Sequence, residues 1–269
     1  MSAPELNTLK IEIDAEIGTL TLNRPDAFNA MSPEMIGELT VAFSWLADQA
    51  PLRALVVTGS GKAFCAGGDV NWFKTGVEDP DVDLPSQVRR GAEALHQAIV
   101  DLRRIPYPVI AAVNGPAAGA GFSLALACDI RIASEAAFFA CAYGRIGASP
   151  DGGMTYFLPR VVGPSRALEI LLNDPNMSAS DALAERLVSE VVAPDELAER
   201  ARAKAEKLAA KAPHYVRMSK ILCGQSIENS LTEHLQLERH GIADSMATED
   251  LRAGVTAFFA GETPEFSGN

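Results

Sequence analysis

Residues 62–69 read KAFCAGGD, and residues 114–121 read NGPAAGAG. Each loop follows an apolar run, precedes a helix-like stretch and carries almost no side-chain bulk. Missing Cβ atoms let a ligand approach the main chain closely. A helix start also leaves free N–H groups and a partial positive charge. If the two loops converge, their N–H groups form an oxyanion hole, which stabilises charge developing on a carbonyl oxygen. The alternative is two tight turns that need glycine for their backbone geometry.

The segments around these loops predict alternating strands and helices. Apolar and polar residues alternate on both sides of residues 16–18, which predicts a β-hairpin. Ser32 and Pro33 are typical of an N-cap and a first helical position, so a helix is expected from there to about residue 50. Apolar spacing predicts another helix around residues 95–102. Strands are expected at residues 8–14, 17–23, 53–58, 108–114, 129–133 and 187–192. This is an α/β arrangement of strand–strand–helix units.

Two further segments differ from this alternation. Residues 80–85 are acidic and contain prolines, which predicts a mobile loop over a site. Beyond residue 192 the sequence has helical character and no strand pattern. We therefore expect a core of residues 1–193 and a helical C-terminal assembly segment of residues 194–269.

The composition is that of an ordinary globular protein, with 48% hydrophobic and 22% charged residues among 269. No apolar run approaches the roughly 20 residues that span a bilayer. The first residues lack the basic and apolar regions of a signal peptide. The cysteines, at positions 65, 128, 141 and 223, form no Cys-x-x-Cys pair. This argues against a disulfide framework or a zinc site, and it favours a reducing cytoplasm.

The net charge of −12 disfavours nucleic acid and anionic membranes as partners. A polyanionic substrate would need positive charge concentrated locally, and Arg24 and Lys62 are the candidates because each lies beside a motif loop. The histidines show no metal-ligand spacing, so no metal site is expected.

Four motifs follow one another along the chain: NRPDAFNAM at residues 23–31, FCAGGD at 64–69, NG to ACDI at 114–130, and PDGG at 150–153. Together they resemble the enoyl-CoA hydratase/isomerase (crotonase) superfamily over nearly the whole length. The resemblance implies an α/β fold, a crotonase-like spiral of ββα units with a helical C-terminal segment. It also implies an acyl-CoA substrate, with coenzyme A as part of that substrate, and a homotrimer or dimer of trimers.

Residue by residue, the resemblance places the two oxyanion-hole donors on the backbone N–H groups of Ala66 and Ala120. Hydratases of the family carry two catalytic glutamates, and their positions hold Ser123 and Tyr143 here. A serine hydroxyl is a poor base near neutral pH, and a tyrosine with the ordinary pKa of about 10 is no better. A hydration mechanism with two glutamates is therefore not expected.

Asp151 is the remaining acidic candidate, since it falls where some isomerases and a dehalogenase of the superfamily place a catalytic aspartate. One carboxylate suits an isomerase, because it can remove a proton beside the enoyl system and return it elsewhere. The alternative for Asp151 is a turn or N-cap residue before two glycines. Isomerisation of an unsaturated acyl-CoA is thus preferred; hydration of a 2-enoyl-CoA and non-catalytic acyl-CoA binding remain alternatives.

The substrate-binding surface that the resemblance implies comes from all four motif regions. Trp72 and Tyr143 are candidates for the wall of an acyl pocket, and Asp69 is also a candidate helix N-cap. Its expected members are Arg24, Ala27, Phe28, Lys62, Ala63, Gly68, Asp69, Trp72, Gly119, Ser123 and Tyr143.

A serine-hydrolase elbow is a rival interpretation. Residues 121–125 read GFSLA, which approximates Gly-x-Ser-x-Gly, and Asp151 and His214 follow in the order that this fold uses. However, the preceding strand is expected to end near Asn114, which leaves a loop too long for a sharp strand–serine–helix turn.

Overall fold

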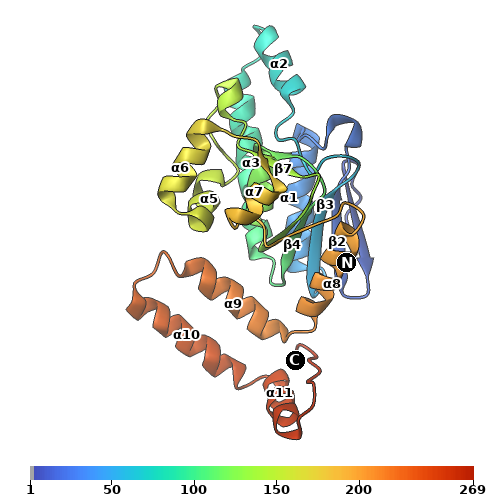
Figure 1. Ribbon diagram of the computed structural model, residues 1–269, viewed down its shortest axis with the longest axis vertical. Coiled ribbons are helices and arrows are strands. Elements are labelled where there is room, and N and C mark those ends of the chain that lie inside the picture. The colour runs from blue at the N-terminus through green and yellow to red at the C-terminus, as the bar shows by residue number, and fades with distance from the viewer. Residues whose placement is uncertain (1–2) are drawn as a thin grey trace.

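A mixed β-sheet forms the centre of the structure, a computed structural model that describes residues 3–269 (Figure 1). Within these residues its six strands run in the order β1-β2-β3-β4-β6-β9. The first two pair antiparallel, which confirms the predicted hairpin, and the other neighbours pair parallel. The strands are β1 (Leu9–Asp14), β2 (Ile17–Leu22), β3 (Ala54–Gly59), β4 (Val109–Val113), β6 (Ile130–Ser134) and β9 (Glu190–Val192). Because β3 and β4 are parallel neighbours, the loops that follow them leave the same edge of the sheet.

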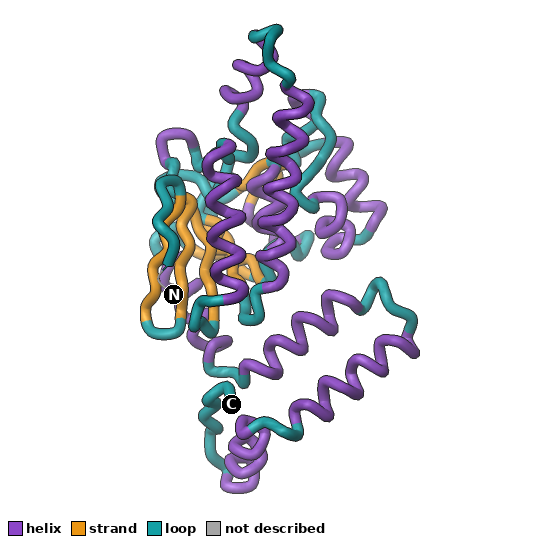
Figure 2. The backbone as a smooth tube through the Cα atoms, turned by 180° about the vertical axis from the view of Figure 1, so that it is seen from behind, coloured by secondary structure: helices purple, strands orange, loops and turns teal. Residues whose placement is uncertain are grey.

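Helices cover both faces of this sheet. On one face α1 (Pro33–Asp48) and α3 (Leu84–Arg104) lie side by side (Figure 2). Their apolar stripes join the strands in a core that includes Leu39, Phe43 and Leu102. On the other face α8 (Leu197–Ala209) packs Leu197 and Ala201 against the strands. Strands buried on both sides read as nearly continuous apolar runs, as β4 does.

Side-chain caps set where the first three α-helices begin. Ser32 caps α1 as predicted, with its hydroxyl accepting from the Met35 N–H. Asp69 caps α2 (Val70–Glu78) in the same way, accepting from the Asn71 N–H at 3.1 Å. Asp83 accepts from the Ser86 N–H and caps α3. The loop predicted at residues 80–85 is therefore shorter than expected, since its last two residues form the first turn of α3.

A second, three-stranded sheet within residues 3–269 consists of β5 (Ala117–Ala118), β7 (Phe138–Ala140) and β8 (Met177–Ser178). The β5 strand belongs to the loop after β4, and a β-bridge joins its Ala117 to Cys65 in the loop after β3. This small sheet therefore fastens the two small-residue loops to each other.

Four further core helices and one 3₁₀ turn begin at or after the second loop: α4 (Ala120–Ala127), α5 (Met154–Val162), α6 (Pro164–Asn173), α7 (Ala179–Ala184) and η2 (Gly144–Ile146). Another 3₁₀ turn, η1 (Pro25–Ala27), lies between β2 and α1. The strand predicted at 187–192 begins only at Glu190, because the Leu187 and Val188 N–H groups bond to the Ala182 carbonyl and close the turn after α7.

Beyond α8 the chain is helical, as predicted. Helices α9 (Pro213–Gln225), α10 (Leu231–Ser245) and α11 (Glu249–Ala260), which we call the arm, extend away from the sheet (Figure 1). Polar contacts at Lys220 and at Glu228 tie the arm to the core. In the middle of α9 the largely buried Lys220 ammonium lies 2.6 Å from Asp129 and donates to the Tyr107 carbonyl. At its tip Glu228 accepts a hydrogen bond from Tyr156 of α5.

Among residues 3–269, none of the helices has the length and apolar character needed to cross a membrane.

Candidate functional site

The two small-residue loops meet at the carboxyl edge of the main sheet, where their backbones touch. A Cβ atom on Gly119 would lie 3.7 Å from the Gly67 Cα, and one on Gly67 would lie 2.9 Å from the Ala118 carbonyl oxygen. Both glycines have positive φ, +100° at Gly67 and +51° at Gly119. Other residues would be strained here and would push the loops apart. The convergence predicted from the sequence is therefore present.

The N–H groups beside this contact differ from the predicted pair. Ala120 is the first residue of α4, and its N–H meets no acceptor within residues 3–269. Ala66, however, donates its N–H to the Phe28 carbonyl at 3.0 Å, so the assignment of Ala66 as a free donor is wrong. The N–H of Gly68, two residues later, meets no acceptor in the described chain. The available pair is thus Gly68 and Ala120, each immediately after a glycine of the contact.

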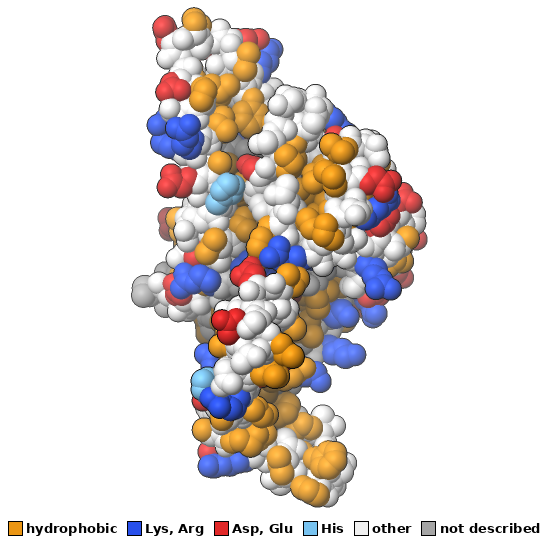
Figure 3. Space-filling view, turned by 90° about the vertical axis from the view of Figure 1, so that its left-hand side faces the viewer, with side chains coloured by type: hydrophobic (Ala, Val, Ile, Leu, Met, Phe, Trp, Pro, Cys, Tyr) orange, Lys and Arg blue, Asp and Glu red, His pale blue; other side chains and the backbone are white. Residues whose placement is uncertain are grey.

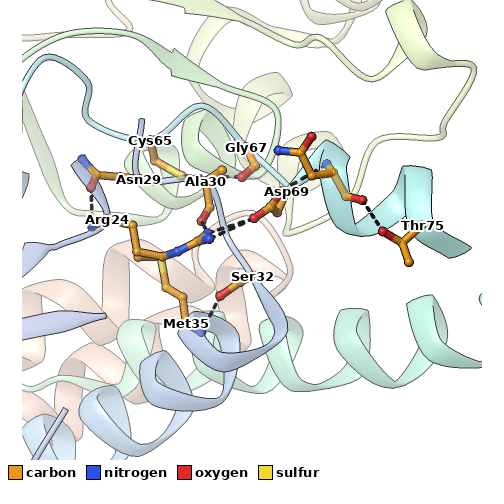
Figure 4. Close-up of polar contacts among 10 residues, drawn as sticks. Arg24, Asn29, Ala30, Ser32, Met35, Cys65, Gly67, Asp69 and Thr75 are labelled. Carbon is orange, nitrogen blue, oxygen red and sulfur yellow. Dashed lines mark hydrogen bonds and ion pairs between the residues drawn. The ribbon is translucent and has the colours of Figure 1, made fainter. Parts of the chain in front are cut away.

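Arg24 and Asp69 hold the first loop in shape (Figure 4). The Arg24 guanidinium donates twice to Asp69 Oδ2, at 3.0 Å each, and also bonds the Ala30 carbonyl. This ion pair occupies both residues, which the sequence suggested as substrate contacts. The buried Asn29 adds hydrogen bonds to the Ser60 and Ala63 carbonyls. Arg24 therefore stabilises the first loop, and its charge is already paired with Asp69.

Ser123, Tyr143 and Asp151, which we call the polar triad, form a connected network beside the second loop. The Tyr143 hydroxyl donates to Asp151 Oδ1 at 2.8 Å and lies 3.0 Å from the Ser123 hydroxyl. The Ser123 hydroxyl also lies 2.9 Å from the Asp151 carbonyl oxygen. Within residues 3–269 the second carboxylate oxygen of Asp151, Oδ2, accepts no hydrogen bond. One oxygen of the carboxylate thus accepts a hydrogen bond from Tyr143, and the other has no hydrogen-bond partner in the described chain.

Burial controls the chemistry of the two hydroxyls. Ser123 is fully buried, on the second turn of α4 and on the same side of the helix as Ala120. Burial, reinforced by the negative charge of Asp151, raises the pKa of Tyr143 well above its ordinary value. Tyr143 therefore stays a neutral phenol that donates to the carboxylate and cannot serve as a base near neutral pH.

Asp151 is not a helix cap, although the sequence left that possibility open. No side chain caps α5, and Gly153 occupies the N-cap position. Gly152 and Gly153 both have positive φ, and a Cβ on Gly152 would lie 3.0 Å from the Ser123 Cβ. These glycines let the chain pass close to Ser123 while the Asp151 side chain points at Tyr143.

The other predicted contacts lie on the rims of the two loops. Phe28 is exposed, whereas Ala63 is buried and accepts from the amides of Asn29 and Asn114. Lys62 is exposed and makes no ion pair within residues 3–269. Trp72, on α2, lies with its ring centroid 5.1 Å from that of Phe73, whose ring flanks Gly68. Ala27 belongs to η1, which precedes Phe28.

In the described chain, Ser123 and Cys65 lack the surroundings of a catalytic nucleophile. Ser123 lies within α4 and bonds to no histidine among residues 3–269, which contradicts the serine-hydrolase alternative; His214 lies on the arm. Burial raises the pKa of the Cys65 thiol to about 12. Across residues 3–269, no three His, Cys, Asp or Glu side chains are grouped as metal ligands.

Asp174 is a site-positioning residue that the sequence did not reveal. Ala142, directly before Tyr143, has φ of +61°, and Asp174 itself has φ of +41°, both unusual for residues with a Cβ. Asp174 Oδ1 accepts from the Ala142 N–H at 2.8 Å, and Oδ2 accepts from Arg145. Two strained residues are thus joined by a hydrogen bond that fixes the segment carrying Tyr143.

Comparisons with known proteins agree over almost the whole chain. The sequence model of a family described as Enoyl-CoA hydratase/isomerase matches residues 12–269. The 1,2-epoxyphenylacetyl-CoA isomerase of Escherichia coli (strain K12) is 36% identical over 95% of this chain and 97% of its own length. The crystal structure of an enoyl-CoA hydratase from Polaromonas sp. JS666 is similar with a TM-score of 0.90 and 33% identity, over 96% of this chain and 99% of the other. An enoyl-CoA hydratase from Bacillus anthracis gives a TM-score of 0.90 and 32% identity, over 98% and 100%. The predicted α/β crotonase-like fold is confirmed.

Replacing Asp174 by alanine tests the positioning contact. We expect D174A to lower the free energy of unfolding by about 1.5–3 kcal/mol, because a charged acceptor is lost. Hydrogen–deuterium exchange at the Ala142 amide should accelerate. D174N is the matched control, since its amide oxygen still accepts from Ala142; it should keep most of the protection. Equal exchange rates in the two variants would contradict the assignment.

Proposed function

Because this chain belongs to the enoyl-CoA hydratase/isomerase family, we propose that it acts on an acyl-CoA thioester and moves a double bond in an unsaturated acyl group. The proposal rests mainly on the polar triad, in which Asp151 supplies the one carboxylate and keeps Oδ2 open. It is also consistent with the name of the Escherichia coli relative, an isomerase.

The proposed reaction is a proton transfer in two steps. Asp151 Oδ2 takes a proton from a carbon beside the enoyl system, and the electron pair of that C–H bond moves toward the thioester oxygen. The N–H groups of Gly68 and Ala120 would stabilise the resulting enolate oxygen. The Asp151 carboxyl exchanges its proton with solvent and then delivers a proton to another carbon of the same system. No electrons enter or leave, so we propose that no redox cofactor takes part and that coenzyme A enters only as part of the substrate.

Hydration of a 2-enoyl-CoA remains the alternative reaction, and binding without turnover is a third possibility. The hydratase names of several relatives favour hydration. The residues at the two glutamate positions argue against it, because Ser123 is buried and hydrogen-bonded and Tyr143 is a neutral donor. Neither group is suited to take a proton from water near neutral pH.

Replacing Asp151 by asparagine tests the reaction. Wild-type protein is incubated in deuterated water with 3-hexenoyl-CoA or 2-hexenoyl-CoA, and the products are analysed by mass spectrometry. We expect deuterium incorporation without addition of water, and a rate that falls on the order of 10²–10⁴-fold in D151N. The exposed acid Asp195, changed to asparagine, serves as the control and should leave the rate unchanged. Water addition to the 2-enoyl substrate would favour hydration, and binding without any turnover would favour the third possibility.

A proline at position 120 tests the oxyanion hole without disturbing the helix. Proline is well tolerated at the first helical position, where it removes an N–H that no intrahelical bond uses. We expect A120P to keep its fold by circular dichroism and to lose about 10²–10³-fold in kcat. The control is L231P, at the first position of α10, where Leu231 is exposed. Full activity of a folded A120P protein would refute the Ala120 assignment.

We also propose that the chain assembles as a homotrimer or a dimer of trimers through its arm. Hydrophobic side chains gather over the lower end of the molecule, where α11 lies (Figure 3). Phe258 and Phe259 on this helix are 79% and 83% exposed. Exposed apolar groups in such a cluster mark association surfaces.

Charge placed on α11 tests this assembly. Sedimentation velocity should show a trimer or hexamer for wild-type protein and a monomer for F258E/F259E, because burying two carboxylates in an apolar contact is costly. L172E, at an exposed position on α6, is the control and should stay assembled. A wild-type monomer at micromolar concentration, or an assembled double variant, would reject the arm as the interface.

A further inference from the structure

A separate pocket of about 410 Å³ lies at the opposite edge of the main sheet from the polar triad. Its lining includes Leu52 and Arg53, which precede β3, and Tyr107, which precedes β4. The small-residue loops instead follow these two strands. Strands of this length span roughly 20 Å, so the pocket is a distinct site. Its other walls come from the start of α9, the segment before it, and the chain after α11.

The charge of this pocket opposes that of the protein. Its lining contains Arg53, Lys211, His214 and Arg217, and no aspartate or glutamate. The whole chain carries 35 acidic and 23 basic residues, so a pocket lined by basic but no acidic side chains differs from the composition of the chain. Lys211 and Arg217 form no ion pair within residues 3–269, and Arg217 lies 3.3 Å from the His214 ring nitrogen Nδ1. Cations that form no ion pair in the described chain, such as Lys211 and Arg217, attract an anion from solution.

Arg53 is the most buried of these cations, with its side chain 15% exposed. Its two terminal nitrogens donate to neutral carbonyls, those of Phe266 at 2.7 Å and Lys211 at 2.9 Å. Its Nε is buried and has no hydrogen-bond partner among the described residues. The nearest carboxylate, on Glu16, is 3.9 Å away and largely exposed. A guanidinium with little compensation for burial is stabilised when an anion binds beside it.

Helix α9 adds to the positive potential. It begins at Pro213 and runs for 13 residues, and no side chain caps its first turn. Arg217 lies at this end, where the helix dipole disfavours cations. An anion bound between the helix end and the basic side chains of the pocket would offset the unfavourable electrostatic energy, because the N–H groups and dipole of a helix N-terminus attract phosphate groups.

We propose that this pocket binds a phosphate-bearing small anion, independently of the reaction at the polar triad. Arginine guanidinium groups and a helix N-terminus both match phosphate oxygens. The anion would contact Arg53 of the core and Arg217 of the arm together. Binding would therefore strengthen the junction between the two, and it would raise thermal stability by an amount that grows with the logarithm of the ligand concentration above its Kd.

Calorimetry and thermal unfolding with pyrophosphate test this site at constant ionic strength. We expect saturable binding and a higher Tm for wild-type protein. The double variant K211M/R217Q should bind at least ten-fold more weakly; both residues are exposed, so folding should be unaffected. The charge-matched control K207M/R239Q, at exposed positions outside the pocket lining, should bind as wild type does.

Parallel titrations with inorganic phosphate and with free coenzyme A identify the source of the phosphate. A second coenzyme A bound per chain that is lost in K211M/R217Q would assign the pocket to a nucleotide phosphate. Pyrophosphate or phosphate binding without that second molecule would assign it to a free anion. Absence of any binding, or equal weakening in the control variant, would overturn the proposal. None of these readouts requires turnover, so failure here is distinguishable from failure of the proposed isomerisation.

Discussion

The close contact between Gly67 and Gly119 is the constraint on which the site depends. Parallel pairing of β3 and β4 brings both loops to one edge of the sheet. With ordinary residues at the contact, however, side chains would keep the two backbones apart. Glycine removes that side chain and also permits positive φ in both loops. The main-chain N–H groups that follow can then point at one ligand atom. Backbone donors held in this way need no reorganisation when charge develops, which is the physical basis of electrostatic stabilisation in enzymes.

The polar triad differs in its side chains from the two-glutamate arrangement of the family's hydratases. The chain has a hydroxyl at Ser123 and another at Tyr143, the positions of the two hydratase glutamates. Neither takes up a proton near neutral pH. Together they hold one oxygen and the main chain of Asp151. If Asp151 is the base proposed above, the two glutamate positions no longer supply bases and instead hold this carboxylate in place.

Local patterns in the sequence predicted much of this architecture. The caps at Ser32 and Asp69, the hairpin, the strands before both loops and the helical C-terminal part all follow from signals within a few residues. The position of Asp151 was predicted from its motif, and its contact with Tyr143 emerged from the fold. Predictions failed where a contact joins distant segments. The resemblance places a donor on Ala66, and nothing local in the sequence shows that the Phe28 carbonyl uses the Ala66 N–H. Asp174 bonds Ala142 across 32 positions, and Arg24 pairs with Asp69 across 45.

The arm is fixed to the core by Lys220, in the middle of α9, and by Glu228 in the turn between α9 and α10. A helical hairpin held at two points has little freedom to swing, so the apolar residues beyond it keep one orientation in the single chain. Association normally costs free energy for ordering the segments that meet. If the arm is the association surface proposed above, that cost is met during folding of the single chain, and the two tethers preorganise the surface.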